Sequence, residues 1–249
     1  MQKLKVISID ISTGTYASFI DNIIKLAASN TSSYVCVANV HMLVEAHKAT
    51  SFADVVNQAD ITTPDGQPIT WALRLLHGVK QDRVAGMDLL PDLLKRAQAD
   101  SVPVFFYGGS QKMLDETNRY IKIHYPRLIN AGYYSPPFRE LSDTELSEIS
   151  ELINKSGAKL VFVILGCPKQ EKWMASMKRR INATMIGIGG ALPVMIGMQK
   201  RAPEWMQKAG LEWFYRLLQE PGRLFRRYAA TNSIFIVLLI KAWIRSKLK

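Results

Sequence analysis

Short apolar runs rich in β-branched residues alternate along the chain with longer segments whose apolar positions recur every three to four residues. The runs predict β-strands, clearly over residues 4–9, 34–38, 102–107, 160–165 and 184–188 and more weakly over 60–62 and 128–133. The periodic segments predict α-helices over residues 16–29, 67–76, 87–97, 111–124 and 143–154. Because short buried strands alternate with helices, we expect an α/β fold: a mostly parallel sheet with helices on both faces.

The helix predicted over residues 143–154 has the clearest start signal. Ser142 and Glu145 have the spacing of a capping box, in which each side chain bonds the backbone of the other. The apolar residues of this segment fall on one helical face, so we expect that face to pack on the sheet.

The pattern changes after residue 188. Two glycines end the last predicted strand, and prolines at positions 193, 203 and 221 then separate short helical pieces. We therefore expect an α/β domain over residues 1–195 and a helical, basic C-terminal appendage over residues 196–249.

Positive charge is concentrated in the appendage. The formal net charge is +11, and residues 216–249 contain eight Lys or Arg against one Glu, so this tail alone carries +7. A nearly neutral body with a cationic end indicates a protein that binds an anionic surface or an anionic substrate. A basic nucleic-acid-binding module is a weaker alternative, because the charge accompanies an apolar helix and is not interleaved with aromatic residues on the body.

An apolar run over residues 229–240 lies within this basic tail. It is shorter than the roughly 20 residues of a transmembrane helix, so we expect no membrane span. Lys241, Arg245 and Lys249 recur every four residues beside it, a pattern typical of a helix in the headgroup plane of an anionic leaflet. The alternative is an ordinary helix docked on the body with a solvated basic face.

Composition excludes several other classes of protein. Hydrophobic residues make up 48% of the chain, which excludes a disordered polypeptide. Cys36 and Cys167 cannot form a disulfide framework, and no Cys or His spacing resembles a zinc site. Lys3 and Lys5 lie within a strand-like run and not in a signal peptide, so we expect a reducing, cytosolic compartment.

Candidate chemistry follows three of the predicted strands, where ligands bind in parallel sheets. Gly108 and Gly109 precede a helix, so this segment is either a phosphate-binding turn or a plain turn. Asp65 lies in a Pro-Asp-Gly turn, and its carboxylate is either a turn residue or a base at the substrate edge. Gln170 offers an amide at the start of a third helix, whereas Cys167 has no histidine partner and is interpreted as a packing residue.

Two further patterns concern the cofactor. Residues 187–190 read Gly-Ile-Gly-Gly, a partial dinucleotide fingerprint that lacks the spaced third glycine and the early placement of a nicotinamide site. A Rossmann-like NAD-dependent oxidoreductase that uses the glycine turns stays as an alternative. No Asp-x-Asp triplet occurs, so a carboxylate pair that binds the metal of a nucleotide diphosphate is not evident. A departing diphosphate would then be neutralised by Arg, Lys and helix N-termini.

Nine segments together resemble one family, the WecG/TagA/CpsF glycosyltransferases (glycosyltransferase family 26). They read NVHM from residue 39, TPDGQP from 63, RVAGMDL from 83, FYGGS from 106, GYYSPPF from 132, LGCPKQEKW from 165, GIGG from 187, RAPEW from 201 and GLEWFYRLLQEPGR from 210. The resemblance extends in order from about residue 5 to 228.

This resemblance implies an inverting, metal-independent transfer of a sugar from a UDP-sugar to a polyprenyl-diphosphate-linked saccharide. The sugar would be of the N-acetylmannosamine type, its uronic acid, glucose or glucuronic acid, and no cofactor is expected. The enzyme would act at the cytoplasmic face of a bacterial membrane during assembly of a surface polysaccharide, as a peripheral protein bound through its appendage. Self-association in solution is also implied.

The resemblance also assigns roles to individual positions. It implies that Asp65 is the base that deprotonates the acceptor hydroxyl. The substrate-binding positions it implies are Asn39, Arg83 and Gln170 for the sugar and diphosphate, Arg216 and Arg223 over the diphosphate, and Gly108, Gly109 and Tyr134 near the nucleotide. Ala38 departs from the family, because many relatives have a hydroxyl residue there.

Overall fold

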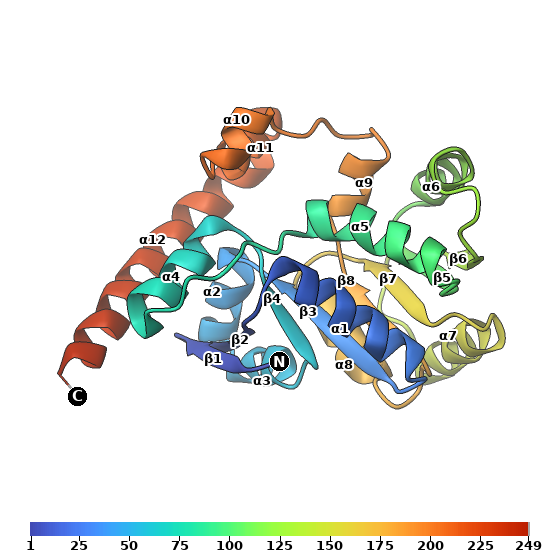
Figure 1. Ribbon diagram of the computed structural model, residues 1–249, viewed down its shortest axis with the longest axis horizontal. Helices are drawn as coiled ribbons and strands as arrows, with labels where there is room; N and C mark the ends of the chain where they lie inside the picture. Colours follow the sequence, from blue (N-terminus) through green and yellow to red (C-terminus); the bar gives the residue numbers. More distant parts are fainter. Residues whose placement is uncertain (249) are drawn as a thin grey trace.

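Six strands form one parallel sheet at the centre of the protein (Figure 1). The computed structural model describes residues 1–248, with the side chains of Lys208, Arg223, Arg226 and Arg227 left out of the description. The strands, in spatial order, are β4 (Ile61–Pro64), β3 (Ser33–Ala38), β8 (Thr184–Gly187), β7 (Leu160–Ile164), β5 (Val104–Gly108) and β6 (Asn130–Tyr134). Every neighbouring pair is parallel, so the predicted sheet is confirmed, including its two weaker strands.

The first predicted strand is wrong in its placement. Residues 4–9 divide into β1 (Lys3–Val6) and β2 (Ile9–Ser12), an antiparallel pair outside the main sheet. Ile7 turns the chain between them with a positive φ of 59°. An apolar run does not itself reveal such a turn, and the prediction of one continuous strand therefore failed.

Helices cover both faces of the sheet, as expected. Alternate residues of β3 point into two separate cores, Tyr34 and Cys36 into one and Val35 and Val37 into the other. The core that contains Tyr34 packs against α2 (Val40–Lys48), α3 (Thr50–Asn57), α4 (Gln67–His77), α7 (Asp143–Lys155) and α8 (Lys169–Met177). The core that contains Val35 packs against α1 (Tyr16–Ala28), α5 (Gly86–Ala99), α6 (Gln111–His124) and α9 (Ala191–Met195).

The capping box predicted at the start of α7 is present. Ser142 accepts a hydrogen bond from the backbone N–H of Glu145 at 3.3 Å, and the Glu145 carboxylate accepts one from the backbone N–H of Ser142 at 2.8 Å. The two reciprocal bonds begin this helix where the sequence predicts it.

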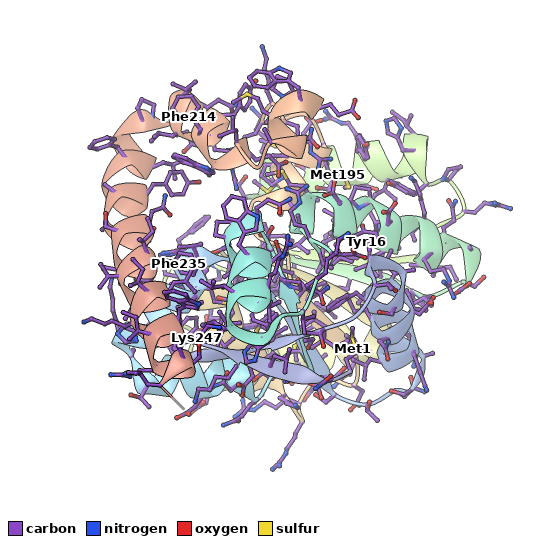
Figure 2. All side chains as sticks on the ribbon, turned by 60° about the vertical axis from the view of Figure 1, so that its left-hand side comes forward. Met1, Tyr16, Met195, Phe214, Phe235 and Lys247 are labelled. Carbon is purple, nitrogen blue, oxygen red and sulfur yellow. The ribbon has the colours of Figure 1, made fainter. Side chains whose placement is uncertain are left out.

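After α9 the chain leaves the sheet and forms α10 (Glu204–Lys208), α11 (Glu212–Gln219) and α12 (Pro221–Lys247). Helix α12 runs back along α2 and α4 (Figures 1 and 2). The helical nature of the appendage agrees with the sequence, whereas a domain boundary after residue 195 stays a prediction.

Helix α12 is longer and more continuous than the apolar run suggests. Its segment Tyr228–Lys247 is 20 residues long with a mean hydropathy of 1.3, so its length and composition suffice to cross a membrane. The expectation that the stretch is too short for a span was therefore wrong. Its Phe235 is nevertheless buried against the body, while Ile236 and Ile240 are exposed.

We predict that Gly108→Ala destabilises the protein more than Gly157→Ala. Both glycines have a positive φ, which costs an alanine about 1–2 kcal/mol. A Cβ at Gly108 would also lie 2.6 Å from the carbonyl oxygen of Ile164, whereas one at Gly157 would contact nothing within 4 Å. Chemical denaturation should show a loss of more than about 2 kcal/mol for Gly108→Ala, and equal losses in both variants would contradict the steric argument.

Candidate active site

Asp65 lies at the carboxyl end of β4, at the edge where all six strands end. Its backbone N–H donates a hydrogen bond to the carbonyl of Ala38 at 2.8 Å, which fastens the Pro-Asp-Gly turn to the neighbouring strand β3. Gly66, with a φ of 96°, then directs the chain into α4. Asp65 is therefore a turn residue, and it also lies at the edge of the sheet where the strands end.

Asn39 lies beside the Asp65 carboxylate at the adjacent strand end. Its Oδ1 accepts a hydrogen bond from the backbone N–H of Met42 at 3.2 Å and so caps α2. Its side-chain amide also favours the ionised form of Asp65 and so lowers the pKa of that carboxyl group. Because an ionised carboxylate can only accept, the Asn39 Nδ2 is the atom that can donate to it. One amide thus begins a helix and stabilises the Asp65 carboxylate.

Arg83 approaches Asp65 from the loop before α5. This loop is tied to β4 by two hydrogen bonds, one from the Val84 N–H to the Pro64 carbonyl at 2.9 Å and one from the Thr63 hydroxyl to the Val84 carbonyl at 3.1 Å. The anchored loop keeps the Arg83 guanidinium within electrostatic reach of Asp65.

A cluster of four charged side chains joins this loop to the appendage. Arg83 pairs with Asp88 at 3.0 Å and with Glu212 of α11. Arg201 pairs with the same two acids, with Asp88 directly and with Glu212 at 3.7 Å between Nε and Oε1. We call these four residues the charge cluster. It places α11 next to the end of β4.

Arg216 follows Glu212 by one helical turn and lies over Gly190. A Cβ at Gly190 would stand 2.6 Å from the Arg216 Nη2, so the guanidinium lies directly over this glycine. Arg216 is also within electrostatic reach of Asp65. The predicted Arg223 belongs to α12, but its side chain lies outside the described residues.

Gln170 lies at the end of β7, on the other side of the same glycine segment. Its Oε1 accepts a hydrogen bond from the Gly166 N–H at 3.1 Å, and its Nε2 donates one to Glu171 at 2.7 Å. A Cβ at Gly187 would lie 2.7 Å from the Gln170 Nε2. The Gly-Ile-Gly-Gly segment therefore lets two polar side chains, Gln170 and Arg216, approach the end of the central strand β8.

The environment of Asp65 sets its proton affinity. Burial is the largest influence and raises the pKa of Asp65 to about 7. The positive charge of Arg83 opposes this rise, and the Glu212 carboxylate adds to it. Arg216 and the Asn39 amide also oppose it. A carboxylate with a pKa near neutrality can accept a proton and release it again at physiological pH.

The remaining predicted positions lie at the same edge but away from Asp65. Gly108 and Gly109 end β5, and Tyr134 ends β6 and stacks on Tyr107 with ring centroids 6.0 Å apart. The strands β3, β8 and β7 separate them from β4. Asn39, Asp65, Arg83 and Arg216 thus form one group with Gln170 beside it, whereas Gly108, Gly109 and Tyr134 form a second group.

The interpretation of Cys167 as a packing residue agrees with its surroundings. Burial and the neighbouring Glu171 raise the pKa of its thiol, so the reactive thiolate is disfavoured. The residues described contain no group of three His, Cys, Asp or Glu side chains arranged to hold a metal ion. Metal independence itself stays a prediction.

Of the charge cluster, only Arg83 is a functional residue predicted from the sequence. Asp88, Arg201 and Glu212 all lie within segments that carry the family resemblance, but no role was assigned to them. One local signal was present: Glu212 and Arg216 are four residues apart, which places them on the same face of a helix.

Comparison with known proteins identifies the family. A model of the "Glycosyl transferase WecG/TagA/CpsF family" matches residues 4–249. An N-acetylglucosaminyldiphosphoundecaprenol N-acetyl-beta-D-mannosaminyltransferase of Bacillus spizizenii strain W23 is 30% identical over 96% of this chain and 91% of its own. A protein of the same description from Bacillus subtilis strain 168 is 31% identical over 96% of this chain and 92% of its own. The chain therefore belongs to the WecG/TagA/CpsF family of glycosyl transferases.

Proposed function

We propose that this enzyme transfers an N-acetylmannosamine-type sugar from a UDP-sugar to N-acetylglucosaminyl-diphospho-undecaprenol, with inversion and without a metal ion. The acceptor and the sugar are those named for the two Bacillus relatives. Membership of a glycosyltransferase family argues against the oxidoreductase and nucleic-acid-binding alternatives. The observation that carries the proposal is the group around Asp65: one partly buried carboxylate flanked by an amide and two guanidinium groups.

In the proposed mechanism the Asp65 carboxylate accepts the proton of the acceptor hydroxyl. The hydroxyl oxygen then attacks the anomeric carbon of the donor sugar while the bond from that carbon to the UDP oxygen breaks. Attack from the face opposite to the leaving group inverts the anomeric centre, as a β-linked product from an α-linked nucleotide sugar requires. The proton stays on Asp65 until the product leaves, and its pKa of about 7 favours this cycle near neutrality.

Arginines would stabilise the negative charge that develops on UDP. Arg216 lies over Gly190 at the end of the central strand and, together with Arg223, would bind the diphosphate. Arg83 is already shared between Asp88 and Glu212, so its role would be to hold the sugar and to support Asp65. Asn39 and Gln170 would orient the donor between them.

The second group of predicted residues would receive the nucleotide. Gly108 and Gly109 have positive φ values of 104° and 77° and lead into α6, whose N-cap is Ser110. A nucleotide sugar that extends along the strand ends would therefore place its sugar at β4 and β3 and its uridine toward β5 and Tyr134.

The appendage would bind the inner face of the plasma membrane peripherally. One face of α12 packs on the body through Phe235, which prevents the helix from being surrounded by lipid in this arrangement. The opposite face exposes Ile236 and Ile240, and Lys241 and Arg245 flank it. Such a helix suits an anionic surface. Lys249 lies outside the described residues, and self-association stays a prediction.

We predict that Asp65→Asn reduces sugar transfer about a hundred- to ten-thousand-fold, because an amide cannot accept the proton. Calorimetry should show that UDP still binds, since Asp65 would contact the acceptor and not the nucleotide. Asp54→Asn, an exposed carboxylate on α3, serves as the matched control and should retain activity. Near-native transfer by Asp65→Asn, measured by mass spectrometry of the lipid-linked product, would contradict the proposed base.

We predict that EDTA leaves the rate of transfer within about twofold of its untreated value. The guanidinium groups of the site would carry out the charge neutralisation for which other glycosyltransferases use a divalent metal. A fall of more than about tenfold that added Mg²⁺ or Mn²⁺ restores would show that the leaving group needs a metal ion.

We predict that Ile240→Asp weakens co-flotation with vesicles that contain phosphatidylglycerol. The change places a negative charge on the exposed apolar face of α12. Ile123→Asp is the matched control, because Ile123 is 72% exposed on α6, away from α12 (Figure 1). Equal flotation of both variants, at unchanged melting temperature, would contradict membrane binding through this face.

A further inference from the structure

Glu212 is a carboxylate of the appendage that is largely shielded from solvent beside the candidate base. Its side chain is 16% exposed, and that of its partner Arg83 is 17% exposed. Both ends of this pair are therefore removed from most of the solvent screening that weakens surface ion pairs. A carboxylate that is shielded from solvent and has no ion-pair partner strongly destabilises the folded protein. The pairing with Arg83 therefore holds Glu212 in place.

The charge cluster is balanced. Arg83 and Arg201 supply two positive charges, and Asp88 and Glu212 supply two negative charges. Asp88 belongs to the first turn of α5, whereas Glu212 belongs to the first turn of α11. The appendage thus reaches this part of the body through two ion pairs, Arg201 with Asp88 and Glu212 with Arg83, and Glu212 is the group that contacts the Arg83 loop.

We infer that Glu212 is a positioning residue for the transfer reaction: it docks α11 on the Arg83 loop and places a second negative charge beside the general base. This inference rests on the proposed function. Docking through Glu212 also places Arg216, one helical turn further along α11, over Gly190. The Arg83–Glu212 pair would thereby help to complete the site with the arginine proposed to bind the diphosphate.

The electrostatic part follows from the groups that face Asp65. These are Arg83 from the loop before α5, Glu212 and Arg216 from α11, and the Asn39 amide from the start of α2. The two cations and the amide favour the ionised form of Asp65 and would make it a weak base on their own. Burial is the largest influence that raises the pKa of Asp65, and the Glu212 carboxylate adds to it against these three groups, so Asp65 can accept a proton.

The test is the pH dependence of transfer by the full-length enzyme with a UDP-sugar and a detergent-solubilised lipid-diphosphate acceptor. The wild-type rate should fall below about pH 7 as Asp65 becomes protonated. Glu212→Gln removes a negative charge, so the pKa of Asp65 should fall. The acid limb of the pH–rate profile, where the rate falls as Asp65 becomes protonated, should then move to lower pH by at least about 0.5 unit. The maximal rate should also fall, because Arg83 and Arg216 are held less firmly.

Asp88→Asn is the matched control. It removes the other carboxylate that holds Arg83 and Arg201, but Asp88 is not among the influences that set the pKa of Asp65. We expect a lower melting temperature and an acid limb at the wild-type pH. Glu212→Asp, which keeps the charge, should restore the acid limb toward its wild-type position.

An unchanged acid limb in folded Glu212→Gln would overturn the inference and leave Glu212 a purely structural residue. Should this variant fail to fold, the double variant Arg201→Gln/Glu212→Gln replaces it, because it removes one charge of each sign and must show the same shift. Failure of the proposed function is distinguishable, since the wild-type enzyme itself would then transfer no sugar or Asp65→Asn would transfer it normally.

Discussion

The parallel direction of all six strands is the constraint on which the candidate site depends. Each strand delivers the residues that follow it to the same edge of the sheet. Because β4, β3 and β8 are neighbours, Asp65, Asn39 and Gly190 lie at adjacent strand ends although they are far apart in sequence. The β1–β2 pair lies outside this sheet, with β2 in contact with β4.

Opposite charges then join the appendage to this edge. Arg83 and Arg201 each pair with both Asp88 and Glu212, and these two acids come from different parts of the chain. Since shielded charges are tolerated only in pairs, docking of α11 and assembly of the site are coupled. The same docking brings Arg216 over the glycine segment at the end of β8.

Helix α12 extends this arrangement toward an apolar surface. It is apolar on two opposite faces, one of which is occupied by the body while the other remains exposed. Length and composition alone permit a membrane span, but the packing of Phe235 on the body fixes the helix along α2 and α4. In the proposed function, one rigid unit would therefore hold the strand-end site close to the lipid that carries the acceptor.

Local patterns in the sequence determined the parallel α/β architecture, the capping box at Ser142 and the position of Asp65 at a strand end, because each depends on residues only a few positions apart. The sequence did not predict α2 and α3, and it suggested one strand where Ile7 makes a turn, since hydrophobic periodicity is ambiguous over such short stretches. Only the tertiary structure decided that Glu212 meets Arg83, 129 residues away, and that the predicted site divides into two groups. The physical reason is that strand order and long-range ion pairs arise from packing of the whole chain, which no short segment encodes.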